Sequence, residues 1–155
     1  MNDLQVALEL YTVRDETRRD FAGTLQRVAQ IGYAGVEFAG YGNLDSTEMS
    51  ALLAETRLKA VSTHLGLDGL DSPQLGASIR YCKDIDCSFI VLPSLPKEYR
   101  TQEGIRVLAP RLDAIGRQCL EHGNTLAIIT MILNSRESER SISLITCLRL
   151  LIPLS

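Results

Sequence analysis

The sequence predicts an α/β fold: a partial TIM barrel of about four and a half βα units. Five short apolar segments typical of strands begin near residues 5, 35, 59, 89 and 125, and each gap between them holds one segment with helical periodicity. Repeated βα units give parallel strands covered by helices. The turn after the first strand, residues 12–16, is charged and has no glycine. A dinucleotide-binding sheet would carry a glycine-rich loop there, so a barrel is favoured over an open doubly wound sheet.

Local signals justify the first two units. Residues 5–11 form the first predicted strand. A charged turn follows, and a helix then begins at Phe21, with Asp20 as its N-cap and Gly32 just beyond its end. Residues 35–39 form the second strand. Asp45 and Glu48 have the spacing of a capping box, which predicts a second helix through Leu53.

The later units follow the same alternation. Residues 59–64 form the third strand, and Ser72 with Pro73 then marks the N-cap and first position of a helix through Cys82. Residues 89–93 form the fourth strand. A long helix over residues 102–121 contains Pro110, which predicts a kink. The fifth strand begins at residues 125–128.

Composition excludes several classes of protein. The 155 residues carry 16 Lys and Arg against 19 Asp and Glu, a net charge of −3, which gives no basic surface for nucleic acid. The four cysteines form no CxxC pair and are expected to be reduced packing residues. The N-terminus does not have the pattern of a signal peptide, and no apolar run is long enough to span a membrane. A cytoplasmic protein is therefore expected.

Candidate site residues lie where the predicted strands end, because a TIM barrel builds its site at the carboxyl ends of its strands. These ends carry Glu9, Tyr11, Glu37, His64 and the loop of residues 93–96. Glu37 lies within an apolar strand, where a carboxylate is costly unless it is paired. A neighbouring arginine or backbone amide would satisfy it equally well, and His64 could be a structural histidine. One Glu and one His are too few for a catalytic metal, which needs about three protein ligands.

Four collinear stretches carry a family resemblance: residues 10–15 (LYTVRD), 20–44, 62–68 (STHLGLD) and 89–101. Together they resemble the sugar phosphate isomerase/epimerase family, within the xylose-isomerase-like barrel superfamily that also includes inosose dehydratases and endonuclease IV. The resemblance implies a TIM barrel that uses a divalent metal (Mn, Mg, Co or Zn) and moves a proton next to the carbonyl of a small carbohydrate. It also implies that Glu37 and His64 line the substrate end, with Tyr11 nearby. The family's metal ligands come from later strands, beginning with a Glu that ends the fifth.

The sequence departs from that pattern at residue 128. Residues 128–155 contain no Gly, Ala, Val, Asp, Lys or aromatic residue. The family usually reads Tyr-His-Asn-His-Asp-Phe-Glu-Phe after the fifth strand, whereas residues 128–135 read IITMILNS. Codons compatible with these residues give Tyr-His-Asn-Asp-Phe-Glu-Phe in a shifted frame. We therefore predict a half-barrel over residues 1–128 and an unrelated tail over residues 129–155, produced by a frameshift that the nucleotide sequence would reveal.

The functional expectation follows from this division. The parent activity is sugar or sugar-phosphate isomerisation or epimerisation, and the chain is expected to lack the metal site, to bind no metal and to be inactive. No catalytic residue is assigned. The alternatives are a non-catalytic half-barrel remnant or interaction module and, less favoured, an endonuclease IV-like repair enzyme. Self-association through open barrel edges is expected, together with an uncovered inward face that includes five apolar residues: Val36, Phe38, Val61, Ile90 and Leu92.

Overall fold

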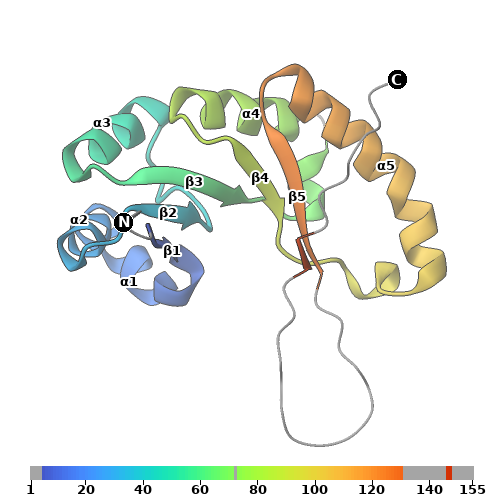
Figure 1. Cartoon of the computed structure of the whole chain (residues 1–155), viewed down its shortest axis with the longest axis horizontal. Coiled ribbons are helices and arrows are strands. Elements are labelled where there is room, and N and C mark those ends of the chain that lie inside the picture. The colour runs from blue at the N-terminus through green and yellow to red at the C-terminus, as the bar shows by residue number, and fades with distance from the viewer. Residues whose placement is uncertain (1–4, 72, 131–145, 148–155) are drawn as a thin grey trace, which may run out of the picture.

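The computed structural model describes residues 5–71, 73–130 and 146–147. Five parallel strands lie side by side in chain order and form a curved sheet with the helices along its outer side (Figure 1). The strands are β1 (Ala7–Glu9), β2 (Gly35–Phe38), β3 (Lys59–His64), β4 (Phe89–Leu92) and β5 (Thr125–Thr130). The predicted α/β alternation is confirmed.

One helix or more fills each gap between consecutive strands. The α-helices are α1 (Arg14–Arg19), α2 (Phe21–Ile31), α3 (Ser46–Thr56), α4 (Gln74–Asp84) and α5 (Gln102–Glu121), and short 3-10 turns cover Leu10–Val13, Leu67–Leu70 and Lys97–Tyr99. Helix α5 runs through Pro110 without interruption. None of the described helices is both long enough and apolar enough to cross a membrane.

The predicted helix ends follow from local chemistry. The Asp20 side chain accepts a hydrogen bond from the amide of Gly23, and Gly32 ends α2 at a φ of 106°, a conformation that favours glycine. Asp45 and Glu48 form the predicted capping box at the start of α3. Ser72 lies outside the described residues. Helix α1 was not predicted, because its six residues are all polar and show no apolar periodicity.

The face on which the strand residues lie differs from our prediction. Val36, Phe38, Ile90 and Leu92 are fully buried and belong to the core between sheet and helices, so they do not line the concave inner face. Val61 is 42% exposed, as expected. A strand buried on both faces reads as a continuous apolar run, so its sequence does not show which alternate residues turn toward the helices. The concave face instead carries the opposite set, which includes Glu37 and His64.

A bulge interrupts the pairing of β2 with β3. Val36 lies opposite Ala60, but Glu37 lies opposite Ser62, so Val61 has no partner on β2. Burial follows the bulge: Ala60 and Thr63 are buried toward the helices, whereas Val61 is exposed and His64 is partly exposed. Bulges commonly re-aim side chains next to functional sites.

The two outer strands of the sheet differ. In the described part of the chain, β1 has no strand on its outer side, as expected for an open barrel. The far end of β5 pairs antiparallel with β6 (Thr146–Cys147), through Ile129 and Thr130. The expectation that both edges are fully open is therefore wrong at that end of β5. Most of the predicted tail lies outside the described residues, and its frameshift origin stays a prediction.

Candidate functional site

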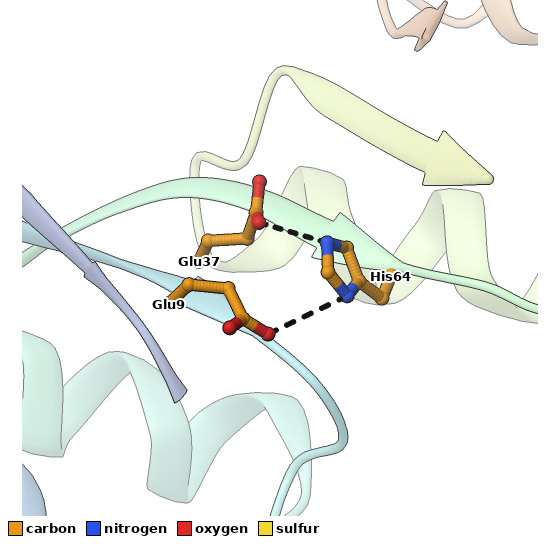
Figure 2. Close-up of side chains that lie close together, drawn as sticks. All are labelled: Glu9, Glu37 and His64. Carbon is orange, nitrogen blue, oxygen red and sulfur yellow. Dashed lines mark ion pairs between the residues drawn. The ribbon is translucent and has the colours of Figure 1, made fainter. Parts of the chain in front are cut away.

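Three side chains converge where the first three strands end. Glu9 is the last residue of β1, Glu37 lies one residue before the end of β2, and His64 is the last residue of β3. Because these strands are parallel and adjacent, their carboxyl ends meet at one edge of the sheet. Figure 2 shows the His64 ring between the two carboxylates. The structure therefore brings Glu37 and His64 together at the predicted end of the barrel and adds Glu9 to them.

Both nitrogens of His64 face a carboxylate. Nε2 lies 2.8 Å from Oε1 of Glu37, and Nδ1 lies 3.8 Å from Oε1 of Glu9. The Nε2 atom is buried, and its short contact with Glu37 does not meet the geometry of a well-formed hydrogen bond. When His64 is protonated, the contact is an ion pair at close range. We refer to these three residues as the strand-end cluster.

Two further contacts orient the carboxylates. The hydroxyl of Ser62, which is 4% exposed, donates to Oε2 of Glu37, and the backbone amide of Tyr11 donates to Oε1 of Glu9 at 3.1 Å. In the described residues, neither carboxylate forms an ion pair with a lysine or arginine. The alternative that an arginine satisfies Glu37 is thus not what the structure shows. Ser62 was missed from the sequence, because only the bulge on β3 turns it toward Glu37.

The charges of the cluster shift its titration. Interaction with His64 lowers the pKa of Glu37 below its usual value of 4.5, against the opposing effect of burial. Interaction with the Glu37 carboxylate raises the pKa of His64 above its usual value of 6.5, with a further contribution from the charge of Glu9. Such a group can carry a proton, donate and accept hydrogen bonds with hydroxyl groups, or hold a cation.

The side chain of Tyr11 is exposed and contacts Arg14. Its side chain is 58% exposed, and the Arg14 guanidinium lies over its ring at 4.7 Å. Only the backbone amide of Tyr11 contacts the cluster, through Glu9. A direct substrate contact by the Tyr11 ring stays a prediction.

A hollow of about 280 Å³ lies between the segments that follow β1 and β2. It is lined by Leu10, Arg14, Thr17, Arg18, Phe21, Ala39, Gly40, Gly42 and Asn43. None of the three residues of the strand-end cluster lines this hollow. Its two arginines give it a positive wall, which suits a small anionic group such as a phosphate. Arg18 also pairs with Asp15, at 3.3 Å.

The metal implied by the family resemblance does not fit the end of β5. That metal takes its first ligand from a Glu at the end of the fifth strand, but β5 ends with Ile128, Ile129 and Thr130, which offer neither carboxylate nor imidazole. The strand-end cluster, in contrast, places one ligand atom from each of its three residues within 4.8 Å of one another. The expectation that the chain binds no metal therefore stays a prediction.

Comparison with solved structures places the fold. The chain resembles a sugar phosphate isomerase/epimerase from Parabacteroides distasonis (17% identity, TM-score 0.61), with 90% of this chain and 58% of that chain covered. It also resembles an AP endonuclease, family 2, from Brucella melitensis (17% identity, TM-score 0.65), with 80% of this chain and 54% of that chain covered. A third match is a xylose isomerase-like TIM barrel/4-hydroxyphenylpyruvate dioxygenase fusion protein (13% identity, TM-score 0.58). That match covers 81% of this chain and 21% of the fusion protein. No protein-family model and no curated protein matches the sequence.

These likenesses show an α/β fold that matches about half of a TIM barrel. The chain spans a little over half the length of the first two structures, 58% and 54%. Their different activities show that this fold serves several reactions, so function must be argued from the site.

The cluster predicts a maximum in the pH dependence of stability for metal-free protein kept in EDTA. A lowered pKa of Glu37 stabilises the fold above pH 4.5, an effect lost as the pH falls through the folded-state pKa. A raised pKa of His64 stabilises it below pH 6.5, an effect lost as the pH rises through the folded-state pKa. Urea unfolding should therefore give wild type a free energy of unfolding about 1 kcal/mol higher than that of Glu37→Gln between these two pH values. The difference should be smaller at lower and at higher pH.

The control is Glu16→Gln, which removes a surface pair with Arg19 at 3.2 Å. It should change the free energy of unfolding by only a few tenths of a kcal/mol. A difference between wild type and Glu37→Gln that keeps growing above pH 8 would contradict the assignment.

Proposed function

We propose that this chain is a half-barrel of the sugar isomerase/epimerase type, with a site for a small carbohydrate at the strand-end cluster. The observation that carries the proposal is the convergence of Glu37 and His64 at the carboxyl ends of adjacent parallel strands, where barrels of this class place their substrates. Carboxylate, imidazole and the Ser62 hydroxyl are groups that hydrogen-bond sugar hydroxyls. Arg14 and Arg18 line a hollow between the segments that follow β1 and β2, and they would suit a phosphate group.

The chemistry of the site supports binding more strongly than turnover. Moving a proton next to a carbonyl needs a base and an electrophile that stabilises the developing oxyanion. Glu37 and His64 supply a base and an acid, but the end of β5 lacks the carboxylate that would begin the family's metal site. A repair endonuclease is disfavoured, because a net charge of −3 opposes binding to a phosphate backbone.

Isotope-labelled protein titrated with aldose and ketose sugars and their phosphates would test the proposal by NMR. We expect amide shifts at the ends of β1–β3, with a Kd of roughly 1 mM. His64→Gln should abolish these shifts, and His122→Gln, which changes the only other histidine, should leave them intact. Absence of any shift in folded wild type would refute the carbohydrate site. Interconversion of aldose and ketose by the chain would show that it is an enzyme.

A further inference from the structure

We propose that Glu9, Glu37 and His64 form a binding site for a divalent transition-metal ion of the Zn²⁺ or Co²⁺ type. The site would use one ligand atom from the end of each of the first three strands. It is separate from the later-strand ligand set that the family resemblance implies. It also does not depend on carbohydrate binding.

The spacing of the three donors suits an ion of this size. Zinc binds nitrogen and carboxylate oxygen at about 2.0–2.2 Å, so tetrahedral ligand atoms lie roughly 3.4 Å apart. The contact of Nε2 with Glu37 is 2.8 Å, and that of Nδ1 with Glu9 is 3.8 Å. They involve different ring nitrogens, so binding through Nε2 requires the Glu9 carboxylate to rotate toward that atom. Glu9 ends its strand and is partly exposed, which leaves it room to rotate.

The contacts around the donors match those of metal ligands. The Ser62 hydroxyl donates to one oxygen of Glu37, and the other oxygen of Glu37 faces Nε2 of His64. Outer hydrogen bonds like that of Ser62 orient ligating carboxylates. Nε2 of His64 is buried without a well-formed hydrogen bond, and a bound ion would satisfy it.

The charge of the cluster also favours a cation. Two carboxylates with a neutral imidazole carry a charge of −2, and no lysine or arginine of the described residues pairs with them. A protonated His64 would cancel half of this charge, whereas a divalent ion would cancel all of it. One imidazole and two carboxylates form a mixed nitrogen and oxygen set, which suits Zn²⁺ and Co²⁺ better than Ca²⁺ or Mg²⁺, because the latter prefer oxygen alone.

The test uses the full chain without a histidine tag, stripped with EDTA, and titrated with Co²⁺ while its visible absorption is recorded. We expect one Co²⁺ per chain, displaced by Zn²⁺ but not by a similar concentration of Mg²⁺. Glu9→Gln, Glu37→Gln and His64→Gln should each weaken binding by about tenfold or more. His122→Gln should bind as wild type does.

A second measurement needs no variant. The chain has two histidines, so NMR of the ring nitrogens in wild type should show Zn²⁺ shifting one imidazole, that of His64, and leaving His122 unchanged. No Co²⁺ absorption and no shift at His64 in folded wild type would overturn the site, as would binding that survives His64→Gln or is lost in His122→Gln. Because these titrations contain no sugar, their failure would leave the carbohydrate site standing, and failed sugar binding would leave the metal site standing.

Discussion

Replacing Phe38 by alanine should cost about 3–5 kcal/mol of unfolding free energy, as large buried aromatic truncations do. Phe38 is fully buried between the sheet and the helices and packs against the ring of Tyr41, with ring centroids 5.6 Å apart. The whole stability of a domain is only about 5–15 kcal/mol. We therefore expect the variant to be largely unfolded, or to melt far below wild type in urea followed by circular dichroism.

Phe89 provides the matched control for this prediction. It is also a strand phenylalanine, but it begins β4 and is 44% exposed. Phe89→Ala should cost about 1 kcal/mol, because little of the lost area was buried. Equal costs for the two variants would contradict the assignment of Phe38 to the helix-covered face and of Phe89 to the open one.

Association of the chain with itself is the second large effect that we propose. The outer side of β1 has no partner strand in the described part of the chain, and the exposed sheet residues include Val61 and Phe89. Open strand edges and exposed apolar surface favour contact with another copy. Analytical ultracentrifugation at micromolar concentration should therefore show a dimer or a larger species.

Substitutions can locate the contact. The double variant Val61→Ser with Phe89→Ser should shift the sedimentation profile toward monomer, because it makes the concave face polar. Val107→Ser removes a more exposed apolar side chain, 65% exposed on α5, and should leave the profile unchanged. A sharp monomeric peak for wild type with cooperative melting would refute self-association.

The parts of the fold that the sequence predicted well depend on neighbouring residues. Asp20 and Asp45 cap α2 and α3 through amides two or three positions away, so their patterns are readable in the sequence. The faces of the strands depend on which neighbour covers them, and for that reason Phe38 and Leu92 were placed on the wrong side. The short antiparallel strand β6 depends on a pairing between distant segments, which no local pattern shows.

The candidate site, like the fold, could be predicted from the sequence only in part. Glu37 and His64 were predictable, because a carboxylate within an apolar strand and a histidine at a strand end are unusual on their own. Glu9 was recognised only as a residue at a strand end, since nothing in the sequence indicates that its carboxylate faces the ring of His64. The Tyr11 ring was expected near the site, and this stays a prediction; the structure shows the Arg14 guanidinium over that ring.

The pairing of β3 with β2 makes the site sensitive to chain length as well as to composition. Side chains alternate along a strand, so the register of β3 against β2 sets which of its residues point inward. Deleting Val61 would leave Ser62 opposite Glu37 and Thr63 opposite Phe38, so His64 would keep its orientation. Deleting Thr63 instead would place His64 opposite Phe38, on the helix-covered face. The imidazole would then turn into the apolar layer under the helices, although every residue of the cluster would still be present. A single-codon deletion could thus abolish this site while a residue-by-residue comparison of its side chains showed no loss.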